Sequence, residues 1–200
     1  MVQSDPTSQT LAYYQDHAAS FFEETVDADM SEALERFLAE VPMGGEVLDW
    51  GCGSGRDSKA MLDAGYDVTS TDATFDLCLR AERLTGRRPR CERFLKLADR
   101  NVFDGIWACA SLLHLPPEDL SVAFDLAFHA LRKNGVLYTS FKYGNDAGMR
   151  DGRWFTDMDE PSLRAALMLR FEILDLWKSR DVRQSREDEL WLNVLAKRRS

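Results

Sequence analysis

The sequence predicts an α/β fold built on one mainly parallel, doubly wound sheet of seven strands. Three observations support this expectation. Strand-like and helix-like segments alternate over residues 45–142, a glycine-rich loop joins the first strand to a helix, and the last two strand-like segments follow each other directly. Strands separated by helices form parallel βαβ units, whereas strands in direct succession pair antiparallel. We therefore expect a doubly wound sheet with an antiparallel edge strand.

The expected elements begin with two helices. Apolar side chains recur at helical spacing over residues 9–25. A second helix begins near Asp29, whose carboxylate forms a capping-box pattern with Glu32, and it ends at Pro42. These helices form an N-terminal helical cap, residues 1–44, in front of a sheet domain, residues 45–200, within one compact unit.

The sheet domain alternates strands with helices. Strands are expected at residues 46–50, 66–71, 89–93, 103–109, 136–142, 171–178 and 189–196, and helices at residues 56–64, 74–85, 117–132 and from about 160. Pro117 suits the first turn of its helix, and Asn134-Gly135 suits the turn that follows it. Residues 143–157 are polar and contain glycine, so we expect a loop there.

Composition excludes several classes of protein. The chain has 200 residues, 44% hydrophobic and 30% charged, which is enough for one buried core. Its formal net charge of −9 disfavours a protein that coats nucleic acid or an anionic membrane. The first fifty residues hold eleven acidic residues and one basic residue, Arg36, so the rest of the chain is nearly neutral. The excess of acids therefore leaves an anionic small substrate open.

The cysteines and the first residues give expectations about the compartment. Four cysteines occur without a C-x-x-C motif, which predicts reduced thiols and no metal site. The first residues have no basic segment followed by an apolar run, and unbroken apolar runs reach five residues. We therefore expect no signal peptide and no membrane span, hence a cytoplasmic protein, acting as a monomer or a homodimer.

The glycine-rich loop is the most informative segment. Residues 47–58 read VLDWGCGSGRDS, a strand that enters a glycine loop and then a helix. Such a loop lets the backbone approach a ligand closely, and the helix N-terminus offers free N–H groups to an anion. Asp72 ends the next strand, where its carboxylate can accept hydrogen bonds from ribose hydroxyls. Together these features predict a nucleotide cofactor.

Details of the loop separate two cofactor classes. A dinucleotide fingerprint places glycine or alanine where this chain has Arg56, and it normally lacks an acid at the position of Asp49. A nicotinamide-dependent oxidoreductase is therefore disfavoured. Asp49 and the Gly51 carbonyl suit a positively charged amino group, and Arg56 with the helix N-terminus suits a carboxylate. An amino group, a carboxylate and a ribose together describe S-adenosylmethionine.

With these residues the sequence resembles the class I S-adenosylmethionine-dependent methyltransferases, which have a Rossmann-like fold. The pattern D-x-G-C-G-S-G-R-D-S followed by G-Y-D-V-T-S-T-D is similar to the tellurite-resistance-type branch of small-molecule enzymes, and the resemblance covers residues 45–142. It implies that the acid and glycines surround the methionyl moiety, that Asp72 holds the ribose, and that Ala73 lies beside the adenine. We expect Arg93-Phe94 to supply an adenine contact. Many members of the family carry an acidic residue at this position, which this chain lacks.

Cofactor contacts are thus expected from the glycine loop, from the ends of the following strands and from the cap. In related enzymes an N-terminal helix lies over the cofactor with a tyrosine pointing inward, which implies Tyr13 or Tyr14 here; helical spacing alone favours a packing role for both. The expected cofactor-binding residues are Tyr13, Tyr14, Asp49, Gly51, Cys52, Gly53, Arg56, Asp72, Ala73, Phe94 and Ala110.

His114 is the candidate catalytic residue. Residues 103–114 resemble the family's fourth strand and the loop after it, and in doubly wound folds ligands lie beyond the carboxyl ends of strands. A histidine there can take a proton near neutral pH. The alternative is that His114 orients a loop by hydrogen bonding, because methyl transfer depends mainly on holding the nucleophile and the methyl group in line.

The C-terminal third supplies the candidate substrate contacts. Basic and aromatic residues expected near loops or strand ends there are Lys142, Tyr143, Arg153, Phe155, Arg183 and Arg186. Convergence of the four cations would favour an anionic small molecule; the alternative is a solvated surface.

The function expected from these observations is methyl transfer to an oxygen, nitrogen or sulfur atom of a small metabolite, which is either anionic or neutral. One alternative is an RNA methyltransferase, because residues 80–100 hold eight basic and three acidic residues. Another is a catalytically silent S-adenosylmethionine-binding regulator whose acidic cap helices contact a partner protein.

Overall fold

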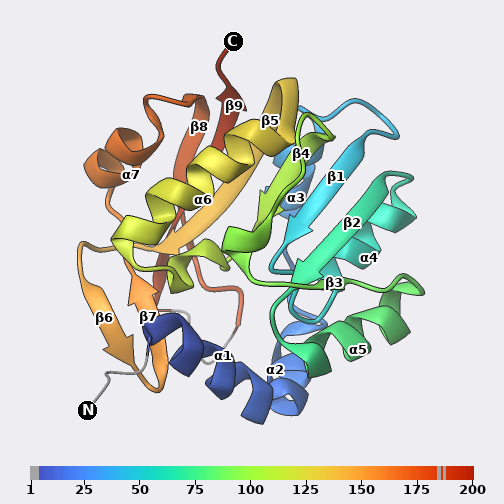
Figure 1. The fold of residues 1–200 in the computed structure, drawn as a ribbon, viewed down its shortest axis with the longest axis vertical. Coiled ribbons are helices and arrows are strands. Elements are labelled where there is room, and N and C mark those ends of the chain that lie inside the picture. The colour runs from blue at the N-terminus through green and yellow to red at the C-terminus, as the bar shows by residue number, and fades with distance from the viewer. Residues whose placement is uncertain (1–4, 184–185, 187) are drawn as a thin grey trace.

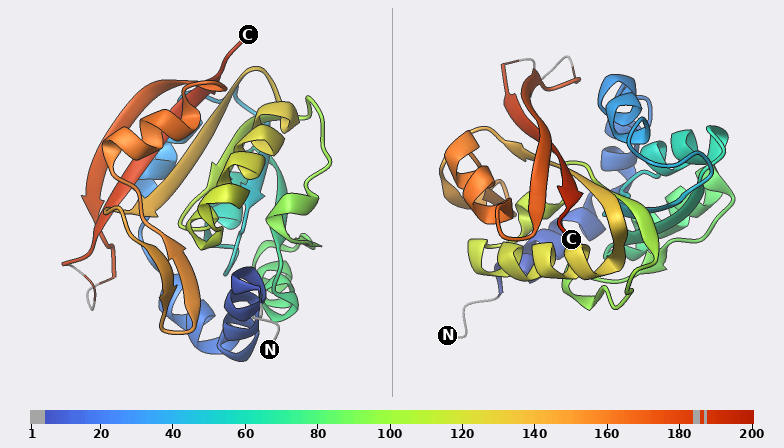
Figure 2. Two further views of the ribbon diagram at one scale, coloured as in Figure 1. Left: turned by 60° about the vertical axis from the view of Figure 1, so that its left-hand side comes forward. Right: turned by 90° about the horizontal axis from the view of Figure 1, so that it is seen from above.

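The computed structural model describes residues 5–183, 186 and 188–200, and it places helices on both faces of a central sheet (Figure 1 and Figure 2). The sheet has seven strands in the order β3-β2-β1-β4-β5-β9-β8. Its strands are β1 (Glu46–Trp50), β2 (Asp67–Asp72), β3 (Arg90–Cys91), β4 (Phe103–Ala108), β5 (Leu131–Lys142), β8 (Phe171–Arg180) and β9 (Leu190–Arg198). The predicted fold class is confirmed.

Strand pairing follows the predicted pattern. The first five strands, from β3 to β5 in the sheet, pair parallel. β9 runs antiparallel between β5 and β8, with Phe141 opposite Leu192 and Trp177 opposite Asn193. The expected antiparallel pairing of the last two strands is thus present at this edge of the sheet.

The helices divide between the two faces and one end of the sheet. They are α1 (Pro6–Asp16), α2 (Ala18–Thr25), α3 (Ser31–Leu38), α4 (Arg56–Asp63), α5 (Phe75–Thr85), α6 (Pro117–Ala130) and α7 (Glu160–Leu167), with short 3₁₀ turns η1 (Phe94–Lys96) and η2 (Leu112–His114). One core cluster joins α6 and α7 to the sheet, and a second joins α3 and α4 to its other face. α1, α2 and a hairpin of β6 (Ala147–Arg150) and β7 (Arg153–Thr156) lie at the end where β1 and β2 finish (Figure 1).

Two sequence-based expectations for local structure were wrong. The single helix expected over residues 9–25 is two helices, because His17 has φ −113° and ψ 15° and its Nδ1 donates to the Tyr13 carbonyl at 2.8 Å. The loop expected over residues 143–157 contains the β6–β7 hairpin. Its turn residues Asp151 and Gly152 both have positive φ, 49° and 77°, which is the geometry that an Asp-Gly hairpin turn favours.

The described helices include none that is long and apolar enough to cross a membrane. In the same part of the chain, no group of three or more His, Cys, Asp or Glu side chains is placed to hold a metal ion.

Candidate active site

The glycine loop after β1 is shaped by close backbone approaches. Gly51, Gly53 and Gly55 have φ values of 89°, 54° and 82°, in the left-handed region that favours glycine. A Cβ on Gly51 would lie 2.6 Å from Cβ of Ser111, and one on Gly53 would lie 3.0 Å from the Phe21 ring. Side chains at these positions would therefore displace the neighbouring segments that face the loop.

Asp72 ties the end of β2 to this loop. Its Oδ2 accepts from the Gly53 amide at 2.9 Å and its Oδ1 from the Thr74 amide at 2.8 Å. Burial raises the pKa of Asp72, and the two backbone donors oppose this by stabilising the carboxylate. These bonds orient the carboxylate toward a cavity at the ends of the strands.

We call this space the inner cavity; it has a volume of about 410 Å³. Three predicted cofactor residues, Asp72, Ala73 and Phe94, line it and do not line the second cavity described below. The Phe94 ring packs edge-to-face on Trp50, with centroids 5.7 Å apart. Other lining residues include Leu77, Leu95 and Ser111. A carboxylate at one side and apolar walls at the other suit a ribose joined to a flat aromatic base.

A second space, the outer cavity, has a volume of about 310 Å³. Predicted site residues from the glycine loop and from the C-terminal third of the chain line it. Six residues line both cavities: Tyr14, Phe21, Gly51, Gly53, Ala110 and His114. We call these six the junction.

The predicted residues that line the outer cavity alone are Asp49, Cys52, Arg56, Lys142, Arg153, Phe155, Arg183 and Arg186, eight in all; Cys109 and Ser140 line it without having been predicted. Two predicted residues line neither cavity. The Tyr13 ring stacks on His17 with centroids 4.2 Å apart, and Tyr143 lies beside Lys178, whose Nζ is 3.9 Å from the ring centroid. Of the two cap tyrosines Tyr14 faces the cavities, and Tyr143, expected to contact the substrate, lines neither of them.

Asp49 lies buried at the wall of the outer cavity. Its Oδ2 accepts from the Ser58 hydroxyl at 2.5 Å. Burial, and next the charge of the neighbouring Asp57, raise the pKa of Asp49 to about 7. A cationic group bound beside Asp49 would favour its charged form, so this position suits the amino group predicted from the sequence.

Arg56 is held by its neighbour in the first turn of α4. Its Nε donates to Oδ1 of Asp57 at 2.7 Å and its Nη2 to Oδ2 at 2.8 Å. The Trp107 indole also donates to Asp57, at 2.8 Å. A carboxylate ligand at Arg56 would therefore share the guanidinium with Asp57, a contact that the sequence-based interpretation did not include.

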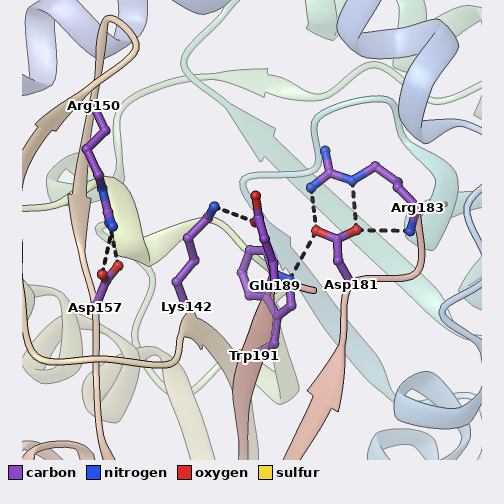
Figure 3. Close-up of polar contacts among 7 residues, drawn as sticks. All are labelled: Lys142, Arg150, Asp157, Asp181, Arg183, Glu189 and Trp191. Carbon is purple, nitrogen blue, oxygen red and sulfur yellow. Dashed lines mark hydrogen bonds and ion pairs between the residues drawn. The ribbon is translucent and has the colours of Figure 1, made fainter. Parts of the chain in front are cut away.

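Two of the outer cavity's cations are also paired within the chain. Figure 3 shows the Lys142 ammonium on the carboxylate of Glu189 and the Arg183 guanidinium on that of Asp181. Arg183 reaches Asp181 through Nε at 2.9 Å and Nη2 at 2.6 Å, and the Trp191 indole donates to the same carboxylate at 3.1 Å. The predicted cations thus converge on one cavity, but convergence alone does not leave them free for a ligand.

His114 and Tyr14 form a hydrogen-bonded pair at the junction. Nδ1 of His114 lies 2.7 Å from the Trp154 carbonyl oxygen, and Nε2 lies 2.7 Å from the Tyr14 hydroxyl. A carbonyl only accepts, so Nδ1 carries the proton and Nε2 accepts from Tyr14. Burial, opposed by the Trp154 carbonyl and supported by nearby cations, lowers the pKa of His114 to about 4. The imidazole is therefore neutral at physiological pH, with both nitrogens engaged.

Ala110 is the junction residue with an unusual backbone. Its φ is 48°, a region that non-glycine residues seldom occupy and that is often found at functional sites. Its amide donates to the Ser140 hydroxyl at 2.8 Å, which fixes the loop after β4 against β5.

The wall formed by β8 and β9 supplies site residues that sequence reasoning missed. Trp177 and Ser179 of β8 lie opposite Asn193 and Trp191 of β9, and all four face the outer cavity. Trp177 and Ser179 are two residues apart on β8, and Trp191 and Asn193 are two residues apart on β9. This spacing places side chains on one face of a sheet. That period of two was the available signal, but it does not tell which face borders a cavity.

Comparison with known proteins agrees with this geometry. Residues 48–139 match a family model described as a methyltransferase domain. The matched segment, just under half of the chain, is similar to that family. This confirms the resemblance inferred from the glycine loop, and the matched segment runs from β1 through most of β5, which includes the loop, Asp72 and His114.

Individual relatives extend the comparison over more of the chain. The Bacillus subtilis (strain 168) protein named "Putative methyltransferase YqeM" is 28% identical over 160 residues, which are 74% of this chain; the chain spans 63% of that protein's length. The Burkholderia thailandensis 1,6-didemethyltoxoflavin-N1-methyltransferase, crystallised with 1,6-didemethyltoxoflavin and S-adenosylhomocysteine, superposes with a TM-score of 0.80 at 21% identity, covering 100% of this chain and 93% of that one. The N-methyltransferase NodS of Bradyrhizobium japonicum WM9, in complex with S-adenosylhomocysteine, gives a TM-score of 0.74 at 17% identity, covering 98% and 100%.

Proposed function

We propose that this methyltransferase domain transfers a methyl group from S-adenosylmethionine to a small molecule bound in the outer cavity. The observation that carries the proposal is the junction: two cavities meet at the glycine loop, Tyr14, Ala110 and His114. When bound, S-adenosylmethionine supplies an electrophilic methyl group on a sulfonium. Two adjoining cavities that share these lining residues suit a reaction in which the methyl donor and the acceptor must lie in line.

The residues of both cavities fit the proposed cofactor. In the inner cavity Asp72 would accept from the ribose hydroxyls, and Phe94 and Ala73 would contact the adenine. At the edge of the outer cavity, Asp49 would hold the amino group, since a buried carboxylate with a raised pKa gains its charge when a cation binds beside it. The glycine loop and the N-terminus of α4 would face the methionyl carboxylate.

The outer cavity supports a small acceptor. Its volume of about 310 Å³ lies at the small end of ligand sites, and the side chains of Phe155, Trp177 and Trp191 offer ring faces beside basic groups. The Burkholderia enzyme is named for a small aromatic heterocycle, 1,6-didemethyltoxoflavin. We propose a small molecule of comparable size, and the cations of the cavity favour an acidic one; the acceptor atom is oxygen, nitrogen or sulfur.

RNA is the less favoured acceptor. Several arginines of the basic segment, residues 80–100, are occupied: Arg87 pairs with Asp67, Arg90 with Asp99, and Arg93 lies 3.8 Å from Asp5. Phosphate binding would have to displace these carboxylates. An RNA substrate would make activity fall steeply with salt, whereas a small acceptor predicts a shallow dependence.

Calorimetry with S-adenosylhomocysteine tests the proposed cofactor. We expect the wild-type protein to bind it and Asp72→Ala to abolish binding. Asp67→Ala is the matched control, because Asp67 lies at the opposite end of the same strand and is exposed. Absence of binding by the wild type, or unchanged binding by Asp72→Ala, would overturn the proposal.

Transfer itself needs a second experiment. Purified protein is incubated with small-molecule extracts and S-adenosylmethionine labelled in its methyl group, and the label is followed into low-molecular-weight products. Binding of the cofactor with no labelled product would favour the catalytically silent regulator instead.

A further inference from the structure

Three cations surround the ring of Phe155. The guanidinium of Arg150 lies 4.6 Å from the ring centroid, that of Arg153 lies 5.1 Å from it, and the ammonium of Lys142 lies 5.2 Å from it. A cluster of like charges around one ring is unfavourable unless anions compensate it. The question is therefore which of the three charges is already neutralised within the protein.

Two of the three have a carboxylate of their own. Arg150 is paired with Asp157, whose side chain is 7% exposed, and Lys142 is paired with Glu189 (Figure 3). Each pair is close to electrically neutral when seen from the cavity. Neither pair therefore requires an external anion.

Arg153 differs from both. Among the residues that the structure describes, it forms no ion pair, and its Nε is buried without a hydrogen-bond partner. Its guanidinium lies over the ring of Tyr13, 4.6 Å from the centroid, and lines the outer cavity. A guanidinium with an unpaired buried donor is unfavourable on its own and gains most from an anion that supplies the missing acceptor.

Arg153 also lies next to the place where the methyl group would be transferred. It is 5.9 Å from the ring centroid of Tyr14. Burial raises the pKa of Tyr14, and the charge and hydrogen bond of Arg153 oppose this rise. Tyr14 belongs to the junction. A negative charge paired with Arg153 would therefore sit beside the acceptor atom and not at a remote end of the substrate.

In the junction, as the structure describes it, no side chain is free to remove a proton from the acceptor. His114 is the titratable base closest to Tyr14 in the junction, and its two nitrogens are occupied by the Trp154 carbonyl and the Tyr14 hydroxyl. Proton removal by His114 would also create an imidazolium close to three cations. An acceptor that arrives already ionised avoids this step.

We propose that the acceptor binds as a monoanion whose negative charge is shared by the atom to be methylated, and that Arg153 selects this form. The inference rests on the proposed function. The acceptor's lone pair forms the bond to the methyl carbon while the carbon–sulfur bond breaks and its electron pair goes to sulfur. The positive charge of the sulfonium and the negative charge of the acceptor disappear together, and no proton moves. Of the three cations around Phe155, Arg153 is the one without an ion pair among the described residues, and its single positive charge matches a monoanion.

A coloured phenol provides a direct test. 4-Nitrophenol is yellow only as its phenolate, so absorbance reports the ionisation of the bound probe. We expect protein saturated with S-adenosylhomocysteine to favour the phenolate and to shift its ionisation midpoint down by about one pH unit, the size of effect that a neighbouring arginine has on an acid. Arg153→Gln should abolish the shift, and Arg153→Lys, which keeps the charge, should retain part of it.

A matched control removes another cation of the same cluster without changing the net charge. The double variant Arg150→Gln with Asp157→Asn deletes one ion pair beside Phe155, and we expect it to keep the shift. Calorimetry with S-adenosylhomocysteine verifies that each variant is folded and loaded. Wild-type protein that binds S-adenosylhomocysteine but leaves the probe unshifted, or a shift that survives in Arg153→Gln, overturns this inference alone. Failure of the wild type to bind S-adenosylhomocysteine overturns the proposed function and this inference with it.

Discussion

The inner and outer cavities obtain their chemistry in different ways. The inner cavity uses a carboxylate held by two backbone amides, at Asp72, and a glycine loop that begins right after β1. The outer cavity draws its cations from β5, β7 and the segment between β8 and β9, and pairs several of them with local acids. The inner cavity takes Asp72 and the glycine loop from neighbouring βαβ segments and is also lined by α1. Most cations of the outer cavity come from parts of the chain that meet only when the sheet is complete.

This difference teaches where specificity resides. In the inner cavity the backbone of the glycine loop limits the available space, so we expect small changes of volume there to have large effects on binding. In the outer cavity Arg56, Lys142 and Arg183 are each paired with a carboxylate, so an unpaired charge such as that of Arg153 matters more than the number of cations. A count of basic residues along the sequence is therefore a poor guide to the acceptor.

The largest effect is expected from filling the space at the glycine loop. Gly51→Ala adds a Cβ at φ 89° and 2.6 Å from Cβ of Ser111. We expect S-adenosylhomocysteine affinity to fall about a hundredfold or more, equivalent to about 3 kcal/mol, with the fold destabilised by about 2–4 kcal/mol from strain and overpacking. Calorimetry and denaturant unfolding measure the two effects.

Gly65→Ala separates backbone strain from steric clash. Gly65 has a nearly equal φ of 87°, but nothing lies within 4 Å of its Cβ position. We expect a loss of about 1 kcal/mol of unfolding free energy with unchanged ligand affinity. Equal affinities for Gly51→Ala and Gly65→Ala would contradict the idea that backbone approach shapes the inner cavity.

The next effect concerns the charge of Asp49. The pKa of Asp49 in the folded protein is raised from 3.8 to about 7, so between these values the folded state holds a proton that the unfolded state has lost. Its contribution to stability therefore declines as pH rises through this window. Asp49→Asn should remove that decline and stabilise the free protein at pH 7 and above, as thermal unfolding across pH 4–8 would measure.

The same substitution should weaken the ligand. We expect Asp49→Asn to lower S-adenosylhomocysteine affinity about 10- to 100-fold, because a charge-assisted hydrogen bond to the amino group is lost. In the wild type, affinity should decline below pH 7 as the carboxyl group is protonated. A wild-type affinity that stays constant from pH 8 to pH 5 would argue against Asp49 as the ammonium partner.

A smaller and opposite effect is expected at His114. Its pKa is lowered from 6.5 to about 4, so the unfolded state binds more protons between these values, and the contribution to stability is lost as pH falls through them. His114→Gln should reduce this acid sensitivity. Imidazole NMR signals of the wild type should show no titration of His114 between pH 5.5 and 8; a midpoint near 6.5 would restore the histidine as a candidate base.

The sequence was most informative where function is local. Asp49, the glycines and Asp72 lie on consecutive segments of a strand, a loop, a helix and a strand, so spacing along the chain maps onto distance in space. The fold class followed from the same alternation. Even here, the ion pair between Arg56 and Asp57 was missed. Adjacent residues in a helix do not ordinarily face each other, so the sequence did not indicate this contact.

The outer cavity was less predictable because it depends on strand register. Trp177 and Asn193 face each other only through the pairing of β8 with β9, and an aromatic residue within a strand is equally typical of a core. The six-residue junction mixes residues from α1, α2 and the loops after β1 and β4, a combination fixed by the docking of the cap on the sheet. Arg153 could be named as a candidate, but that it forms no ion pair with the described residues became apparent only once the ion pairs of its neighbours were known.

The smallest effect is expected from a pair that only links two parts of the outer cavity. Lys142 at the end of β5 pairs with Glu189 beside β9, and the two side chains are 20% and 35% exposed. Solvent screens a pair of this exposure, so a double-mutant cycle with Lys142→Met and Glu189→Gln should give a coupling free energy of about 0.5–1 kcal/mol in unfolding experiments. Saturating S-adenosylhomocysteine should leave this coupling unchanged, because the pair does not belong to the junction. A coupling free energy above about 2 kcal/mol would contradict the view that solvent screens this ion pair.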